Sequence, residues 1–263
     1  VAVNEFAMST SRNKSYTENE YIYIYLRHSY ALDVTGIPSL DITLDSSSEL
    51  ATYYSGSGST TLTFRYQVKA GDTDTDGIEI TPNVYLNGGI ISFSKEGIID
   101  HANLTFTPSS TDKVLIDTRT PLIDSVFTPS PTVHYKDQKL QFQIHFDEVV
   151  EVTGVPRLAV EIAGSTVYAN YVVGTKGQAL LFERGVLETE LDLGGISITS
   201  PLQLNSGTIK DTAGNMADLN FILDGTTLTQ LANTDIDGHT PYVTQVSPPA
   251  NTTYYENDEL IIQ

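Results

Sequence analysis

Apolar and polar residues alternate one by one in several long stretches of the chain. The alternation is clearest in residues 39–45, 61–68, 140–146 and 158–162. A period of two places every apolar side chain on one face of a half-buried β-strand. No stretch of comparable length shows the 3.6-residue period of a helix, so the pattern predicts an all-β protein.

The same pattern occurs twice, at a constant offset of 118 residues. Residues 34–38, Val-Thr-Gly-Ile-Pro, return at 152–156 as Val-Thr-Gly-Val-Pro. A second echo, at an offset of 120 residues, marks the ends of the units, where residues 116–121 return at 236–241. Residues with an identical partner 118 positions later include Leu40, Tyr53, Gly56, Leu62, Phe64, Val68, Asp74, Gly77, Ile78, Ile80, Leu86, Asn87, Gly89 and Ile91. A period of domain size is typical of a tandem array.

Each unit reads as a β-sandwich. Short strands separated by Gly, Asn, Ser and Pro predict an antiparallel two-sheet sandwich of immunoglobulin type, and each unit is large enough to bury its own core. The expected strands of the first unit lie near residues 19–28, 39–46, 51–55, 60–69, 77–87, 89–93 and 103–107, and those of the second about 118 positions later.

The echoes divide the chain into residues 1–118, 119–238 and 239–263. Both boundaries are short polar stretches that end in Pro, so neighbouring units should be coaxial or gently bent. Residues 242–263 would be the first strand of a third unit, and we therefore expect the chain to be an internal piece of a longer protein. An unpaired strand needs a partner edge, which favours pairing with another chain.

Charge and composition exclude several classes of function. The chain carries 33 acidic and 14 basic residues, a net charge of −19, which repels nucleic acid and anionic lipid. It has no Cys, which rules out a disulfide framework and a thiolate metal site. No segment approaches the ~20 apolar residues of a membrane span. We therefore expect neither nucleic acid nor an inserted membrane as a partner.

The most distinctive chemical motif is an acidic loop at residues 72–77, Asp-Thr-Asp-Thr-Asp-Gly. Asp72, Asp74 and Asp76 alternate with threonines, and Gly77 would permit a sharp turn, as a calcium loop requires. Strand-like flanks, and the lack of a Glu at the twelfth position, argue against an EF-hand. The alternative interpretation is an acidic, hydrated turn between two strands.

The second unit keeps this motif only in part. Asp192 retains the middle carboxylate, Glu190 replaces the first and Gly194 replaces the third. Asp237 ends the second unit as Asp117 ends the first, so both are candidate calcium ligands together with Asp192.

The expected fold brings further carboxylates to the boundary between the units. Asp117 leaves the first unit at the end that carries the acidic loop. Asp147 and Glu148, and Asp211 in the last hairpin, should face back toward it from the second unit. Carboxylates gathered in this way would repel one another, and a bound divalent cation would reverse the sign and lock the hinge. Asp211 also begins a stretch typical of an Asx-stabilised turn.

Other reactive residue types show no catalytic arrangement. The five histidines are scattered without metal-ligand spacing, and we interpret them as surface or structural: His28, His101, His134, His145 and His239. No nucleophile, base and orienting group stand together, so we expect no catalysis. The clustered tyrosines could form a sugar- or partner-binding patch, although core and edge positions are the favoured interpretation: Tyr21, Tyr23, Tyr25, Tyr53 and Tyr54.

The chain resembles the tandem bacterial immunoglobulin-like, or cadherin-like, repeats of large surface adhesins. The resemblance rests on the Val-Thr-Gly-x-Pro-x-Leu opening, on residues 62–77 and 204–215, and on the Ile-Asp-x-x-Thr-Pro junctions. It covers nearly the whole chain and implies a secreted or outer-surface bacterial protein whose domains form stalks, often stiffened by calcium. The third acid of the loop, which is Gly in the second unit, departs from that pattern.

We therefore expect non-catalytic stalk or adhesive repeats of a bacterial cell-surface protein, which space or present a binding region. Their partners would be the neighbouring repeats and a surface glycan or protein receptor, with calcium at the junctions. Two alternatives stay open. One is a carbohydrate-binding module of an extracellular protein, and the other is a structural subunit of a surface layer or fibre assembled by strand exchange.

Overall fold

The structure is a computed structural model, and it describes all residues except 1–5, 11–12, 175, 248–252, 254 and 257–263. In the first repeat (residues 1–118) the strands are β1 (Phe6–Thr10), β2 (Lys14–Tyr16), β3 (Tyr21–Thr35), β4 (Ser39–Thr43), β5 (Ser48–Ser55), β6 (Ser59–Gln67), β7 (Thr73–Asp74), β8 (Glu79–Ile80), β9 (Ile90–Lys95), β10 (Ile98–His101), β11 (Phe106–Thr107) and β12 (Val114–Asp117). In the second repeat (residues 119–238) the elements are β13 (Ile123–Phe127), β14 (Val133–Tyr135), β15 (Lys139–Thr153), β16 (Arg157–Ile162), β17 (Ser165–Val173), β18 (Gly177–Gly185), β19 (Leu191–Asp192), β20 (Ser197–Gln203), β21 (Thr208–Lys210), α1 (Gly225–Ala232) and β22 (Asp235–Asp237). The predicted all-β class is confirmed.

Each repeat combines one large sheet with one small sheet. The large sheets run in the order β10-β9-β3-β6-β5-β4-β8 and β13-β15-β18-β17-β16-β20, and the small ones in the order β2-β12-β7 and β14-β22-β19. Most pairs in the described part are antiparallel, as predicted. The pairs β1–β11, β2–β12 and β14–β22 are parallel, because they join early and late strands of a repeat that run in the same direction.

Two separate hydrophobic clusters fill the space between the sheets. In the first repeat Phe64 of the large sheet and Ile116 of the small sheet belong to one cluster. In the second repeat Phe182 and Ile236 belong to the other. Burial of each such side chain contributes roughly 1.5–3 kcal/mol, so the shared apolar layer holds the two sheets of each repeat together as a β-sandwich. The expected boundary at residue 118 falls between the clusters, while independent folding of each unit stays a prediction.

The identical residues of the two repeats include glycines at points of close backbone approach. Gly36 has φ of +75°, and a Cβ atom there would lie 2.8 Å from Cα of Gly89. Gly154 has φ of +70°, and a Cβ atom there would lie 2.8 Å from Cα of Gly207. No larger residue fits this contact without moving the backbone, which explains why the Val-Thr-Gly-x-Pro opening recurs.

The strand expected at residues 77–87 is the largest error within the first repeat. The structure has only Glu79–Ile80 there, followed by isolated bridges at Asn83 and Tyr85. Pro82 lacks the N–H group that a continuous ladder needs. The strand expected at 103–107 is likewise reduced to Phe106–Thr107.

The strand expected near residues 221–225 is absent, because residues 221–224 form no strand and a short helix begins at Gly225. Helix α1 begins after Asp224, whose Oδ1 accepts a hydrogen bond of 2.6 Å from the backbone N of Thr227. Such an N-cap satisfies one of the free N–H groups at the helix start, and Leu231 anchors the helix in the core. Among the described residues no helix has the length and apolar character needed to cross a membrane.

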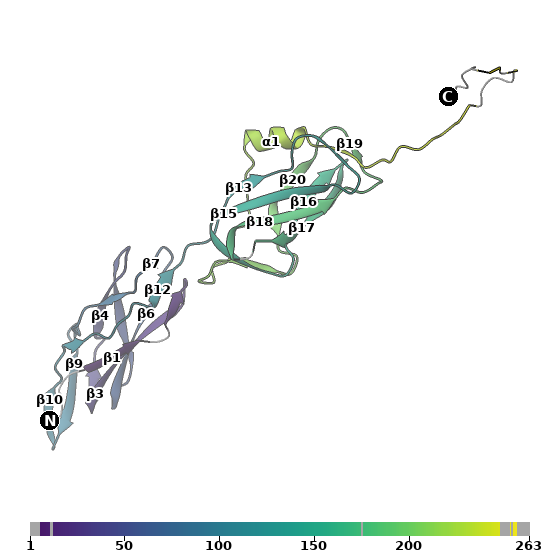
Figure 1. The fold of residues 1–263 in the computed structure, drawn as a ribbon. Coiled ribbons are helices and arrows are strands. Elements are labelled where there is room, and N and C mark those ends of the chain that lie inside the picture. The colour runs from purple at the N-terminus through teal and green to yellow at the C-terminus, as the bar shows by residue number, and fades with distance from the viewer. Residues whose placement is uncertain (1–5, 11–12, 175, 248–252, 254, 257–263) are drawn as a thin grey trace.

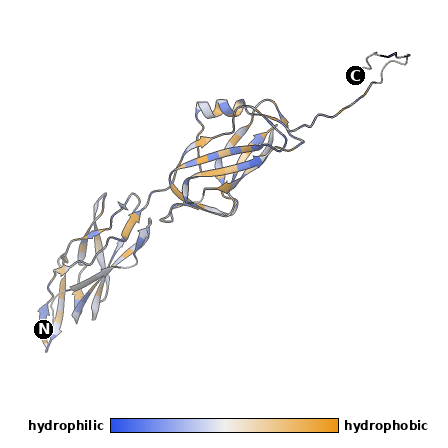
Figure 2. Ribbon diagram, in the orientation of Figure 1, coloured by the Kyte–Doolittle hydropathy of each residue, from blue (hydrophilic) through white to orange (hydrophobic). Residues whose placement is uncertain are grey.

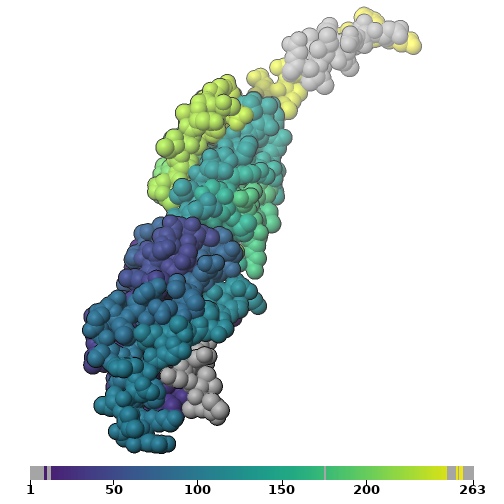
Figure 3. All heavy atoms as spheres, turned by 90° about the vertical axis from the view of Figure 1, so that its left-hand side faces the viewer, coloured from purple at the N-terminus to yellow at the C-terminus, as the bar shows by residue number. Residues whose placement is uncertain are grey.

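The two repeats lie end to end, joined by a short connection after β12 (Figure 1). A view turned by 90° shows them in contact along one elongated body (Figure 3). Hydrophobic and hydrophilic residues alternate along the strands of both (Figure 2). Residues 241–247 are exposed and form no strand. Most of the strand expected at 242–263 lies outside the described residues, so a third unit stays a prediction.

Candidate functional site

Three carboxylates meet where the repeats join. Asp117 ends β12 of the first repeat, whereas Glu148 lies within β15 and Asp211 directly follows β21 of the second. One carboxylate oxygen of each lies within 4.8 Å of the other two. The sequence predicted that these three side chains gather at the boundary, and the structure places them there.

A tight turn fixes Asp211. Its Oδ1 accepts hydrogen bonds from the backbone N of Gly214 (2.5 Å) and of Asn215 (2.8 Å), as expected for an Asx-stabilised turn. Asn215 Nδ2 donates to Asp211 Oδ2 (2.7 Å) and to the backbone oxygen of Asp117 (2.9 Å). The Asn215 side chain therefore ties the last hairpin of the second repeat to the end of the first.

Glu148 is the least satisfied member of the group. Its Oε1 atom is inaccessible to solvent and has no hydrogen-bond partner, although Arg119 Nε lies 3.4 Å away in a charge contact. Burial, and then the negative charges of Asp117, Asp211 and Asp147, raise the pKa of Glu148, and the positive charge of Arg119 only partly opposes them. The three carboxylates therefore outnumber the one positive charge beside them.

Asp147 binds the connecting segment instead of joining the three carboxylates. Its Oδ1 accepts a hydrogen bond of 2.8 Å from the backbone N of Leu122, and its Oδ2 lies 3.8 Å from Arg119 Nη1. The backbone N of Asp218 also donates to the oxygen of Pro121 at 2.9 Å. The connection between the repeats is thus both short and fastened to the second repeat.

The acidic loop of the first repeat forms a second group of carboxylates. Asp74 and Asp76 gather with Asp45, each offering an oxygen within 4.8 Å of the others. Asp74 is buried and accepts a hydrogen bond of 2.7 Å from the backbone N of Gly77. Burial, and then the charges of Asp45 and Asp76, raise the pKa of Asp74.

The sequence predicted the glycine of this loop but not all of its carboxylates. Gly77 has φ of +112°, and a Cβ atom there would lie 2.5 Å from the oxygen of Thr111, so the expected need for Gly is confirmed. Asp45 was missed, because it comes 29 positions before Asp74 and lies outside the motif. Its only sequence signal is its place just after an alternating strand.

Asp72 does not join the cluster of its neighbours. Its Oδ2 accepts a short hydrogen bond from the Tyr66 hydroxyl and one of 2.7 Å from the backbone N of Lys69. Burial, and then the hydrogen bond to Asp72, raise the pKa of Tyr66 far above its ordinary value. Asp72 therefore pins the loop to the end of β6.

The remaining predicted ligands of the second repeat are not gathered. Asp192 accepts hydrogen bonds from the backbone N of Ala163 and, at 3.0 Å, of Gly194. Asp237 accepts one of 3.2 Å from the backbone N of His239. In the described part of the chain, neither belongs to a group of three potential metal ligands.

The acidic loop and the junction nevertheless lie side by side. Thr118 Oγ1 accepts a hydrogen bond of 3.1 Å from the backbone N of Gly71 and donates one of 2.9 Å to the oxygen of Asp72. Asp117 also pairs with Thr73 in the small sheet. The loop and the chain exit share one end of the repeat, as predicted, but their carboxylates form two groups instead of one.

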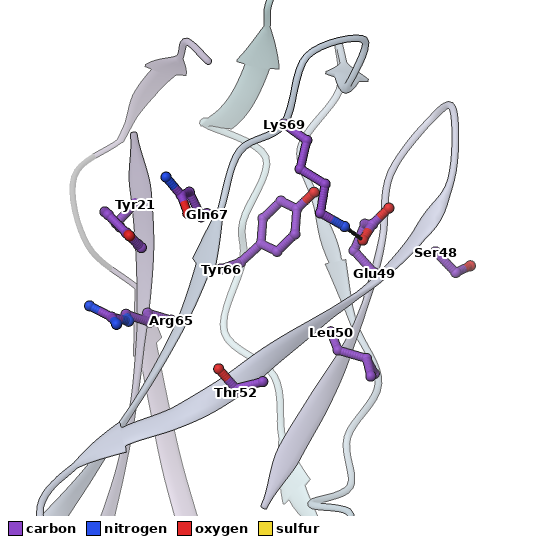
Figure 4. A pocket seen from close by; sticks show the side chains of 9 residues that line it. All are labelled: Tyr21, Ser48, Glu49, Leu50, Thr52, Arg65, Tyr66, Gln67 and Lys69. Atoms are coloured by element: carbon purple, nitrogen blue, oxygen red, sulfur yellow. Dashed lines mark hydrogen bonds and ion pairs between the residues drawn. The ribbon is translucent and has the colours of Figure 1, made fainter. Parts of the chain in front are cut away.

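The tyrosines divide between the core and the outer face of the first repeat. Tyr53 packs edge-on against Phe64, with 6.0 Å between the ring centroids. Tyr21 and Tyr54 flank the guanidinium of Arg65 on the outer face of the large sheet. Beside Arg65 lies an open hollow of about 510 Å³ (Figure 4).

Comparison with known proteins adds no family assignment. No model of a protein family matches the chain, and no curated protein sequence does.

Proposed function

We propose that the chain forms non-catalytic stalk or adhesive repeats of a bacterial cell-surface protein, and that calcium stiffens the junction between them. The observation that carries this proposal is the group formed by Asp117, Glu148 and Asp211, which draws on both repeats. Calcium prefers carboxylate and carbonyl oxygens in a flexible arrangement. The donor types fit the ion, and Glu148 Oε1 supplies a buried oxygen that has a charge contact with Arg119 but no hydrogen bond.

Electrostatics explains why a cation would matter here. Two unit charges 4.8 Å apart repel by about 3.5 kcal/mol at an effective dielectric constant of ~20. Salt and solvent reduce this at the exposed edge of the junction, and Arg119 supplies one compensating charge. A divalent cation would turn the remaining repulsion into attraction, so that the same residues would hold the repeats together.

Calcium bound at the junction would fix the orientation of one repeat relative to the other. Residues 119–122 are already fastened to the second repeat, so the hinge between the repeats lies at residues 117–119. The hydrogen bonds across it run from Asn215 Nδ2 to the oxygen of Asp117 (2.9 Å) and from the backbone N of Arg119 to Asp117 Oδ1 (3.0 Å). An ion shared by Asp117 with Glu148 and Asp211 would span this hinge. An elongated pair of repeats held in this way suits a stalk that keeps a binding region at a distance.

The group of Asp45, Asp74 and Asp76 is a second candidate for calcium. It lies within one repeat, and Asp74 is already hydrogen-bonded to Gly77. An ion there would stiffen the acidic loop beside the junction, but it would not connect the repeats.

Titration calorimetry of the chelator-treated chain with calcium chloride tests the proposal. We expect saturable binding that Glu148→Gln weakens at least tenfold, while Asp33→Asn, at an exposed position on β3 outside both clusters, leaves it unchanged. Absence of binding, or equal binding by both variants, would contradict the proposal. The lack of catalysis and the surface location stay predictions, as does the alternative of a fibre subunit built by strand exchange.

A further inference from the structure

The outer face of the large sheet differs sharply between the two repeats. In the first repeat its strands β3, β5 and β6 present Tyr21, Tyr23, Tyr54 and Arg65. At the matching positions, 118 residues later, the second repeat has Lys139, Gln141, Val172 and Glu183. Folding does not require the aromatic residues, because the second repeat builds the same sheet without them.

These side chains of the first repeat form one continuous aromatic surface around a cation. The Arg65 Cζ atom lies 4.8 Å from the centre of the Tyr21 ring and 4.1 Å from that of Tyr54. Tyr23 joins them, with ring centroids 6.2 Å from Tyr21 and 6.0 Å from Tyr54. The guanidinium thus makes cation–π contacts with two tyrosine rings.

Arg65 has no acidic partner in the described part of the chain. The contacts of its guanidinium there are with the two tyrosine rings, and the guanidinium makes neither a hydrogen bond nor a salt bridge with the described residues. Most of the other described basic side chains, in a protein with 33 acids, pair with a carboxylate. The N–H donors along the edge of the guanidinium are therefore open to a ligand.

A polar hollow of about 510 Å³ opens beside this cation. Arg65 and Tyr21 lie on one side of it, and the ion pair of Lys69 with Glu49 lies on the other (Figure 4). Thr52 also lines it, as does Gln67. The hollow thus combines hydroxyl, amide, carboxylate and ammonium groups with an aromatic rim.

We propose that this face of the first repeat binds a saccharide that carries a carboxylate group. A guanidinium edge binds a carboxylate through two parallel hydrogen bonds. Tyrosine rings offer an apolar face for the C–H groups of a sugar ring, and their hydroxyls stay polar. Thr52, Gln67 and Glu49 provide partners for the sugar hydroxyls. The site is distinct from the calcium junction and extends the proposed function by naming a ligand class.

A peptide fits this surface less well. Strand β6 lies between β3 and β5 and is paired with both, so this part of the sheet offers no free edge for an added strand. The polar lining of the hollow does not suit the apolar side of a helix. The net charge of −19 repels anions at a distance, but salt screens charges beyond ~8–10 Å, so Arg65 dominates at contact.

Binding of trigalacturonate and of its methyl ester to the full chain, followed by NMR titration, tests the proposal. The two probes share the same sugar chain, and the ester replaces each carboxylate by a neutral methyl ester. We expect saturable binding of the acid at about 1 mM or below, and weaker binding of the ester. A parallel titration with sialyllactose, against lactose, distinguishes a uronic acid from a sialic acid as the source of the carboxylate.

Two variants and one control sharpen the test. Arg65→Gln should weaken binding of the acid at least tenfold and change that of the ester less than about twofold. Tyr54→Val, which introduces the residue found at the matching position of the second repeat, should weaken binding of both the acid and the ester. If Arg65→Gln does not fold, Tyr54→Val alone tests the site. Glu183→Gln, at the position that matches Arg65, should have no effect.

Failure of every acidic saccharide to bind saturably would overturn the proposal, as would equal binding of acid and ester. Binding that Arg65→Gln and Tyr54→Val leave unchanged would also contradict it. An oligoglutamate peptide that binds more tightly than the acidic saccharides, and depends on Arg65, would assign the surface to a protein partner instead.

Discussion

The two repeats solve one structural problem with different chemistry. In the first, the turn after β6 is held by Asp72, which accepts hydrogen bonds from Tyr66 and Lys69. At the same places in the second, Glu190 accepts hydrogen bonds from the guanidinium of Arg184 and from the backbone N of Leu187. A carboxylate pins the turn in both repeats. The comparison shows that this acid has a structural role, although the sequence places it within a calcium-like motif.

The middle acid of the loop, by contrast, has the same residue type in both repeats but different surroundings. Asp74 of the first repeat gathers with Asp45 and Asp76. Its counterpart Asp192 instead accepts hydrogen bonds from the backbone of Ala163 and Gly194, which occupy the positions that match Asp45 and Asp76. The same carboxylate is thus part of an anionic cluster in one repeat and satisfied by backbone N–H groups in the other.

The largest effect should come from breaking the turn of the second repeat. Arg184→Ala leaves Glu190 buried without its cation, because the two side chains are only 10% and 13% exposed. Loss of one partner of such a pair costs about 3 kcal/mol, whereas Tyr66→Phe, which removes one hydrogen bond to Asp72, should cost ~1.5 kcal/mol. Urea unfolding of both variants measures the difference, and equal losses would show that the two turns do not differ as described.

The effect of Glu148→Gln on the stability of the chain should change sign between calcium-loaded and calcium-free conditions. With calcium at 100 times its dissociation constant, the ion stabilises the native state by ~2.7 kcal/mol, and the variant should lose most of this. After chelation, the variant should be at least as stable as the parent, because it removes a charge from a repulsive group. Thermal unfolding under both conditions tests this, and destabilisation of the variant under both would point to a packing defect.

The contributions of Glu148 at the junction and of Glu190 in the turn of the second repeat to the free energy of unfolding should depend on pH in opposite directions. Since the pKa of Glu148 is raised in the folded state, its contribution to stability is present below pH 4.5 and is lost as the pH rises through the raised pKa. Without calcium, mild acidification should therefore stabilise the junction, while it weakens calcium binding.

For Glu190, burial tends to raise the pKa, but hydrogen bonds from Arg184 and Leu187 and the guanidinium charge hold it below the ordinary value. Its contribution to stability is present above pH 4.5 and is lost as the pH falls through the lowered pKa. Urea unfolding of the parent, Glu148→Gln and Arg184→Ala at a series of pH values around 4.5 separates the contribution of Glu148 from that of Glu190. A parent whose pH profile matches that of both variants would contradict the assignment.

The smallest effect is expected from building the first loop into the second repeat. Ala163→Asp with Gly194→Asp would place three carboxylates around Asp192, and Asp tolerates the φ of +49° at position 163 better than Ala does. We expect one additional calcium ion per chain, bound weakly, and a change in calcium-free stability within ~0.5 kcal/mol. Titration calorimetry gives the number of calcium ions bound per chain. If that number is the same in the variant and the parent, the three acids do not suffice to bind calcium.

The sequence predicted the sandwich strands well wherever apolar and polar residues alternate without interruption. It failed at Pro82, which breaks a strand that the pattern would continue, and at α1, whose one clear signal is the capping residue Asp224. Both failures are local events that a repeat of 118 residues does not reveal. The second repeat has Ser200 at the position that matches Pro82 and carries its own proline, Pro201, within the continuous strand β20. The described residues of the first repeat contain no helix that matches α1. Neither copy could therefore correct the other.

The candidate sites were predictable where the topology brings chain ends together. Asp117, Glu148 and Asp211 were expected at the boundary, but the loop expected to carry Asp147 and Glu148 is wrong, because strand β15 continues through both residues to Thr153. Asp45 could not be found, because its contact with Asp74 is set by the packing of β4 against the acidic loop. Asp147 was placed at the junction correctly, but its hydrogen bond to the backbone of the connecting segment becomes visible only in the structure.

The central claim is that calcium joins the two repeats through the junction carboxylates, and the rotational diffusion of each repeat tests it most directly. Backbone ¹⁵N relaxation, recorded with calcium and after chelation, reports whether residues 13–117 and 123–237 tumble together. We predict one shared diffusion tensor with calcium, two distinct ones after chelation, and two in Glu148→Gln even with calcium present. A single shared tensor under all three conditions, or two tensors in the calcium-loaded parent, would contradict the claim.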